Sequence, residues 1–360
     1  MGVHYPARQS LSTTPISTFD ETVSSAFNNS TFCGKQIYFE CDSQTLPFNE
    51  VEIEFFQAEH KLICWYNSID GSGNIKIFSL DSGKLLHSCS VPNKLINVYY
   101  SNGNDIIIIS TTDVSCLSLS AFAFSDILTI ANENVYGCDF SRKSNIMVGT
   151  TETDIVLTDS LTSETKKLIS QSEALGAVKK QFNDTSNIPA EALPYFSLPR
   201  LLCNDRFVVL IITLPQGQTT FGGFCIIDLK TNEVKYYVES CLGGKLTVTD
   251  DSIISVVTSN TDKQLSITQI VLPDLSEKQV SIEANSYDEN ILVNPANQNT
   301  LHLYNNEGIT KAIFLDAQSN EIYRQFTIDQ PNVEGLLFTQ DLFLFFTSTE
   351  DSKSLIAYLF

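Results

Sequence analysis

The stretch IKIFSLDSGKLL, residues 75–86, decides the fold of this chain. Its first half combines β-branched and aromatic residues, which fit the pleated, half-buried surface of a strand. Asp81, Ser82 and Gly83 follow, and these residue types favour turns. Two leucines then begin a second apolar run. The stretch therefore predicts a hairpin of two short antiparallel strands.

The same unit recurs along the chain. Its turn contains an aspartate in five copies and a serine in a weaker sixth copy, and these anchors are Asp81, Ser120, Asp159, Asp228, Asp274 and Asp316. The intervals between them are 39, 39, 69, 46 and 42 residues. Four of the five are close to the period of about 40–45 residues that is typical of a four-stranded propeller blade. We interpret the five aspartates as structural members of the blade turns.

The two ends of the chain bear on the number of blades. The last period contains three strand-like runs, 333–338, 342–347 and 355–360, and an isolated strand-like run lies near the start, at 36–41. Pairing this N-terminal strand into the last blade would close the ring and remove two exposed edges. We therefore predict an all-β fold, a single seven-bladed β-propeller of four-stranded antiparallel blades. Eight blades remain the alternative, because Asp42 lies 39 residues before Asp81.

This blade layout resembles the WD40 family and its divergent relatives over roughly residues 34–360. The aspartates at the turns stand where that family has the Asp of its Trp-Asp pair, but here they follow Leu, Thr, Ile or Pro. The sequence contains no Trp-Asp pair and no Gly-His pair. The resemblance implies the propeller fold and a role as a docking platform for other proteins.

Two segments fall outside the repeat. Residues 1–33 are rich in Ser, Thr, Asn and Pro, and we expect a flexible polar extension or an arm that packs on the ring. An insertion is expected at about 171–200, beginning with a short helix that has Ser172 as its N-cap. Its proline-rich second half predicts either a docking epitope or a cluster folded over a blade. The candidate partner-binding residues are Tyr195, Phe196, Leu198, Arg200, Lys179 and Lys180.

Charge and cysteine usage narrow the class of partner. The net charge of −20 repels phosphate backbones, so we expect protein partners, with basic surfaces favoured, and no nucleic acid. Nine cysteines without a C-x-x-C pair suggest reduced core thiols. Residues 1–20 lack the apolar stretch of a signal peptide, and no apolar run is long enough to insert into a membrane. These observations predict a cytoplasmic or nuclear protein.

Signals of chemistry are sparse. The four histidines, at positions 4, 60, 87 and 302, show no metal-ligand spacing, and no nucleophile elbow or phosphate-binding loop occurs. We therefore predict no catalytic residue, no metal and no cofactor, and a non-catalytic scaffold or adaptor within a larger assembly. The alternative is a propeller enzyme or small-molecule binder with its site at the central channel. A third possibility is the N-terminal propeller of a coat-like or pore-like assembly protein.

Overall fold

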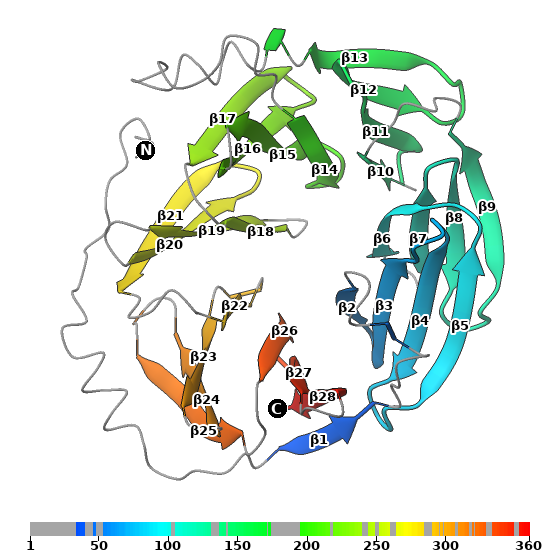
Figure 1. The fold of residues 1–360 in the computed structure, drawn as a ribbon. Coiled ribbons are helices and arrows are strands. Elements are labelled where there is room, and N and C mark those ends of the chain that lie inside the picture. Colours follow the sequence, from blue (N-terminus) through cyan, green and yellow to red (C-terminus); the bar gives the residue numbers. More distant parts are fainter. Residues whose placement is uncertain are drawn as a thin grey trace. The chain divides into compact units, whose positions relative to one another are not determined.

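The chain is an all-β protein whose strands form seven four-stranded antiparallel sheets, the blades of a seven-bladed β-propeller (Figure 1). Helix is almost absent, since only Ser172 and Glu173 are helical among the described residues. The computed structural model describes residues 34–39, 46–47, 53–101, 105–130, 137–141, 143–170, 172–173, 195–216, 219–239, 244–248, 252–259, 264–283, 290–294, 296–297, 299–306, 309–316, 319, 321–328, 333–348 and 353–360.

The strands group into two compact units, and the first contains four blades within residues 96–282. In each blade the strands pair in chain order. The strands are β6 (Leu95–Ser101), β7 (Asp105–Ser110), β8 (Asp113–Ser118) and β9 (Phe124–Thr129); β10 (Gly137–Ser141), β11 (Ile146–Thr150), β12 (Asp154–Asp159) and β13 (Thr165–Ser170); β14 (Tyr195–Leu202), β15 (Phe207–Gln216), β16 (Thr219–Asp228) and β17 (Glu233–Glu239); and β18 (Gly244–Val248), β19 (Ser252–Ser259), β20 (Gln264–Val271) and β21 (Ser276–Glu283).

The second unit contains three blades, within residues 15–95 and 283–360. Two of them run in chain order, and the third has the order β1-β28-β27-β26. The strands are β2 (Glu54–Ala58), β3 (Lys61–Asn67), β4 (Gly73–Ser79) and β5 (Leu85–Val91); β22 (Asn290–Val293), β23 (Thr300–Asn306), β24 (Ile309–Leu315) and β25 (Ile322–Ile328); and β26 (Glu334–Phe338), β27 (Leu342–Ser348), β28 (Lys353–Leu359) and β1 (Lys35–Tyr38).

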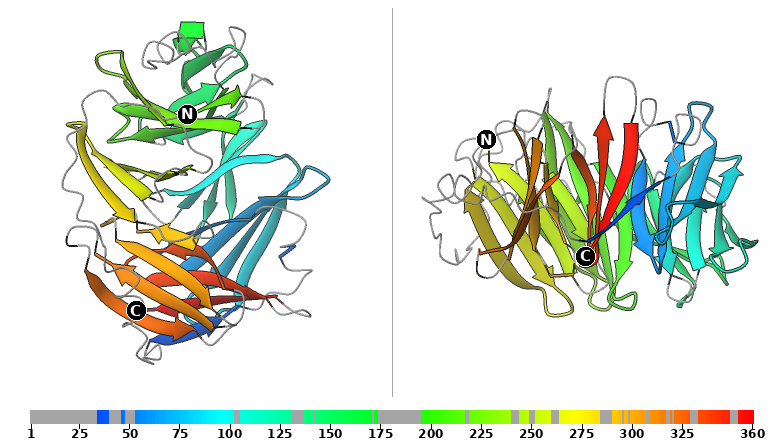
Figure 2. Two further views of the ribbon diagram at one scale, coloured as in Figure 1. Left: turned by 60° about the vertical axis from the view of Figure 1, so that its left-hand side comes forward. Right: turned by 90° about the horizontal axis from the view of Figure 1, so that it is seen from below.

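The N-terminal strand completes the last blade. β1 pairs antiparallel with β28, with Lys35 opposite Leu359 and Tyr38 opposite Ile356, and Figure 2 shows blue β1 beside the red C-terminal strands. Ile37 and Phe39 anchor this segment in the core of the unit, packed with Leu342 and Leu355. The prediction of seven blades completed by an N-terminal strand is therefore confirmed. The eight-bladed alternative is wrong, because residues 35–38 belong to the seventh sheet and not to an additional one.

Middle strands of the blades contain continuous apolar runs. Residues 106–109 in β7 and 207–210 in β15 are at most 1% exposed. Strands that are covered on both faces show such continuous runs and lose the alternation of half-buried strands. Between the last two blades of the second unit the core is aromatic, and Phe314, Phe326, Phe338, Phe343 and Tyr358 belong to one cluster.

One turn recurs between the third and fourth strands of the blades. The residue at its start accepts a backbone hydrogen bond from the residue four positions later, as Asp159 does from Ser163 at 2.8 Å. Its side chain also accepts backbone N–H groups, and the Oδ1 atom of Asp159 lies 2.8 Å from the nitrogen of Leu161. Such local bonds from Asp and Ser side chains stabilise turns. The residues at this position are Ser79, Ser118, Asp159, Asp228 and Asp316.

The predicted turn aspartates therefore fall into two groups. Asp159, Asp228 and Asp316 occupy the accepting position. In the first blade this position belongs to Ser79, whose hydroxyl accepts the N–H of Asp81. Asp274 is exposed in the turn between β20 and β21, which follows a cis Leu272–Pro273 bond.

Candidate functional site

The predicted docking segment ends inside a strand. Tyr195, Phe196, Leu198 and Arg200 all lie on β14, the first strand of its blade, and Tyr195 pairs with Thr213 of β15. The insertion that we expected at 171–200 therefore stops before Tyr195, because residues 195–200 are part of the blade. Lys179 and Lys180 lie outside the described residues.

A bulge in β14 sets the direction of Arg200. The register between β14 and β15 shifts between Ser197 and Arg200, so Leu198 and Pro199 have no partner in the ladder. Proline has no backbone N–H to offer a ladder and is tolerated at bulges. Bulges bend a strand and re-aim the side chains that follow, often beside functional sites. Here the residue that follows is Arg200.

Arg200 lies half-buried beside an aromatic ring, and one of its guanidinium nitrogens has no hydrogen-bond acceptor among the described residues. Its guanidinium carbon is 5.7 Å from the centre of the Tyr99 ring, a cation–π distance. The Nη1 atom is buried and has no hydrogen-bond partner among the described residues. A buried donor without an acceptor is costly, so the described residues leave Nη1 unsatisfied.

Asp139 on β10 contributes a buried carboxyl group to the cluster that Arg200 and Tyr99 form. Its Oδ2 atom accepts the N–H of Leu201 at 2.8 Å, and its Oδ1 atom accepts the N–H of Phe140 at 3.0 Å. The Tyr99 hydroxyl also contacts this carboxyl and donates to the carbonyl oxygen of Phe140. Burial raises the pKa of Asp139, against the opposing effects of the Arg200 charge and of these hydrogen bonds. The cluster thus joins the first strands of three consecutive blades, β6, β10 and β14.

A second set of polar contacts joins β10 and β14 at the hairpins that follow them. The Oδ2 atom of Asp205 accepts hydrogen bonds from Ser141 at 2.6 Å and from Ser144 at 2.8 Å. Lys143 donates to the side-chain oxygen of Asn204 at 2.7 Å. Asn204 and Asp205 both have left-handed backbone conformations, with φ of 55° and 64°, a region that Asn and Asp tolerate better than other residues. These contacts therefore hold the two blades together beside the residues of the candidate site.

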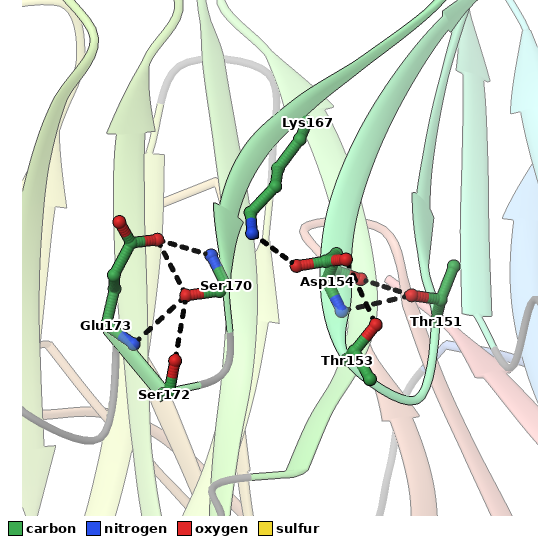
Figure 3. A network of polar contacts seen from close by, with 7 residues as sticks. All are labelled: Thr151, Thr153, Asp154, Lys167, Ser170, Ser172 and Glu173. Atoms are coloured by element: carbon green, nitrogen blue, oxygen red, sulfur yellow. Dashed lines mark hydrogen bonds and ion pairs between the residues drawn. The ribbon is translucent and has the colours of Figure 1, made fainter.

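The chain leaves β13 toward β14 through the network of Figure 3. Ser170 accepts the N–H of Glu173, and the Glu173 carboxylate accepts both the hydroxyl of Ser170 at 2.7 Å and its N–H at 2.8 Å. This reciprocal pair is a capping box. The helix cap is therefore Ser170, and the prediction of Ser172 as N-cap is wrong by two residues because the reciprocal partner, Glu173, lies three positions after Ser170.

The other half of that network is an ion pair at the edge of the same blade. Lys167 lies 2.8 Å from Asp154, whose backbone N–H is accepted by the hydroxyl of Thr151. The hydrogen bond from Lys167 holds the pKa of Asp154 below its usual value. Both side chains reach solvent, so the pair contributes little to stability.

One histidine and two cysteines that could take part in chemistry are buried. His302 is 4% exposed and lies 2.9 Å from the hydroxyl of Thr300, and burial lowers its pKa to about 4. Burial likewise raises the pKa of the Cys138 and Cys225 thiols. Within the described ranges, no group of three or more His, Cys, Asp or Glu side chains could hold a metal ion.

Sequence reasoning identified Arg200 but missed Tyr99, Asp139 and Asp205. Asp139 carried one usable signal, since it is a carboxylate inside the short apolar run Gly137–Phe140. Such a residue needs buried partners. Tyr99 and Asp205 carried none, because their partners are 41 and more than 60 residues away.

Comparisons with known proteins identify a fold and no family. No protein-family model matches the chain, and no curated protein does. The β-propeller domain of Myceliophteria thermophila Cps50 (Swd1) superposes with a TM-score of 0.51 at 10% identity, covering 86% of this chain and 100% of that domain. An oligogalacturonate lyase in complex with manganese superposes with a TM-score of 0.53 at 12% identity, covering 91% and 97%. At these identities the likeness shows the propeller fold alone. None of the described helical residues forms a segment that could cross a membrane.

Proposed function

We propose that this chain is a non-catalytic docking scaffold, a divergent WD40-like propeller that serves as a subunit or adaptor of a cytoplasmic or nuclear protein assembly. Its partner binds at β14 and at the segment that precedes this strand. The partner supplies a backbone carbonyl or a carboxylate to Arg200. The net charge of −20 supports a partner with a basic surface and argues against nucleic acid.

The half-buried arginine on β14, Arg200, carries this proposal. Arginine is enriched at the energetic centres of protein interfaces, where a partly buried fork of donors meets acceptors from the partner. Arg200 already has the aromatic support of Tyr99 and a strand that fixes its backbone.

Affinity purification of the tagged full-length chain from its native cells, with mass spectrometry, tests the scaffold role. We expect at least one partner in near-stoichiometric amount. Arg200→Gln should reduce its recovery at least fivefold. Lys230→Gln is the matched control, because it removes the same charge from an exposed turn of the same blade.

The preceding segment is tested by deleting residues 183–194, which spares β14. Loss of the partner from this variant supports a contact there. A partner recovered equally well with Arg200→Gln and wild type would reject the site at β14. A chain that purifies alone under all salt conditions would reject the scaffold role itself.

A further inference from the structure

The last strand of one blade contains no Asp, Glu, Lys or Arg, unlike the last strands of the other six blades. Opposite its first strand, each blade ends in a strand that pairs on one side only among the described residues. Six of these strands contain at least one Asp, Glu, Lys or Arg, and these are β1, β9, β13, β17, β21 and β25. β5 has the sequence LLHSCSV and contains none.

Charge at an edge is one way in which proteins prevent unwanted strand pairing. A bulge is another, and β5 has one where its register with β4 shifts between Ile77 and Phe78. β9, β13 and β25 carry a similar shift, so the bulge is not what distinguishes β5. From His87 to Val91 the pairing with β4 is continuous. This part of β5 is a regular, uncharged edge.

The side chains of β5 alternate in exposure along the strand. Leu86, Ser88 and Ser90 are exposed, and two of these are serines. The residues between them are half-buried, and the thiol of Cys89 turns back to the carbonyl oxygen of Ile75. The exposed side chains are therefore one leucine and two serines, and residues 85–91 contain no proline.

Three lysines lie on β5's neighbour β4 or in the residues just before and after β5. Lys84 precedes β5, Lys94 follows it, and Lys76 on β4 stands directly opposite Ser88. Residues directly opposite on neighbouring strands have their side chains on the same face. The ammonium groups of these lysines form no ion pair with a described residue. An otherwise acidic protein thus has three cationic residues near an uncharged strand edge.

We propose that the β5 edge binds an extended acidic segment of a partner protein, which adds to the blade as a fifth strand. Main-chain hydrogen bonds to β5 supply the pairing, as in other cases of strand addition. Acidic residues at the two ends of the segment meet Lys84 and Lys94, and about five uncharged residues lie between them. The net charge of −20 opposes this contact only weakly at physiological salt, where charges more than about 8 Å apart are largely screened.

This site extends the proposed scaffold role to a second surface and is independent of Arg200. A fluorescein-labelled nonapeptide, Glu-Glu-Thr-Val-Ser-Val-Thr-Glu-Glu, serves as the probe in a fluorescence anisotropy titration of the full chain. We expect saturable binding that weakens at least fivefold when the glutamates are replaced by lysines. A central proline in the peptide should have a similar effect, because it removes a main-chain donor.

Ser88→Asp is the decisive protein variant. It adds a negative charge at the middle of the edge, and Lys76 opposite it keeps the blade tolerant of the change. Ser125→Asp makes the same change on β9, an end strand that already carries Asp126, and is the matched control. We expect Ser88→Asp and the double variant Lys84→Glu, Lys94→Glu to weaken binding at least fivefold, and Ser125→Asp to stay within twofold of wild type.

Several outcomes would overturn the β5 site. Absence of saturable binding would do so, as would equal binding of the acidic and basic peptides or equal losses in Ser88→Asp and Ser125→Asp. Circular dichroism of each variant verifies that the sheet content is retained. If the edge fails but a partner still co-purifies with the full chain, the scaffold role stands and only the β5 site is rejected.

Discussion

The backbone of Gly83 lies directly against the carbonyl oxygen of Tyr38. A Cβ atom added to Gly83 would lie 2.0 Å from that oxygen, and the residue has a φ of 72°, in the left-handed region. β1 reaches this position from the N-terminus, and Lys35 on the same strand donates to the carbonyl oxygen of Asp81 at 2.8 Å. The turn after β4 therefore helps to place the strand that completes the last blade.

Gly83→Ala should destabilise the protein by at least about 2 kcal/mol, because both the backbone conformation and the close approach to Tyr38 exclude a side chain. Gly71→Ala is the control, since Gly71 has a φ of 86° but nothing within 4 Å of an added Cβ. That control should cost only about 1 kcal/mol. Urea unfolding of the two variants measures the difference in their free energies of unfolding. Equal losses of stability would show that the backbone around Tyr38 shifts at little cost to accommodate a Cβ atom.

The recurring turn predicts which aspartates matter. Asp159→Ala should lower the free energy of unfolding by about 1 kcal/mol, because the backbone N–H groups of Leu161 and Thr162 lose their acceptor. Asp81→Ala should change it by less than about 0.5 kcal/mol, as is usual for surface positions. Thermal unfolding of both variants compares them. A larger loss for Asp81→Ala would contradict the assignment of the turn to Ser79.

His302 predicts a loss of stability in mild acid. Burial lowers its pKa to about 4, below the value of about 6.5 in an unfolded chain, so the folded state favours the neutral ring. Its contribution is complete above about pH 6.5 and is lost as the pH falls toward 4, by roughly 3 kcal/mol at most. Urea unfolding at pH 7.5, 5.5 and 4.5 should show a flatter pH dependence for His302→Asn than for wild type. Parallel curves would mean that the ring titrates normally.

The buried thiols should resist alkylation. Burial raises the pKa of Cys138 and Cys225, so little thiolate forms at pH 8, and neither sulfur is accessible. Mass spectrometry after treatment with iodoacetamide should find both residues unmodified in the native protein and modified in urea. Rapid native labelling at either position would show that its blade opens locally.

The architecture was predictable because its signals are local. The hairpin period, the turn chemistry and the apolar strands each depend on neighbours within a few residues, and together they predicted four-stranded propeller blades. The count of seven also required the pairing of the N-terminal strand with the last blade. The Asp139–Arg200 cluster was not predictable in the same way. Its strands are far apart in sequence, and the bulge that aims Arg200 depends on how β14 pairs with β15.

The predicted position of the turn in the first blade was wrong for a similar reason, because it too depends on strand pairing. The sequence offers both Ser79 and Asp81 as acceptors, and aspartate is the commoner choice at such turns. The backbone bond from Gly83 to Ser79 places the start of the turn two residues earlier than the aspartate suggests. Only the pairing of β4 with β5 distinguishes the two positions.

The recurring turn has a consequence for the history of the repeat. Its geometry requires a short side chain with an oxygen acceptor, and either serine or aspartate meets that requirement. Mutation can therefore exchange these residues, and replace the residue before them, while the blade keeps its shape. In such a protein, the sequence similarity between relatives is lost long before the similarity of their backbone structures. Relatives of this chain should be sought by comparing folds, blade by blade.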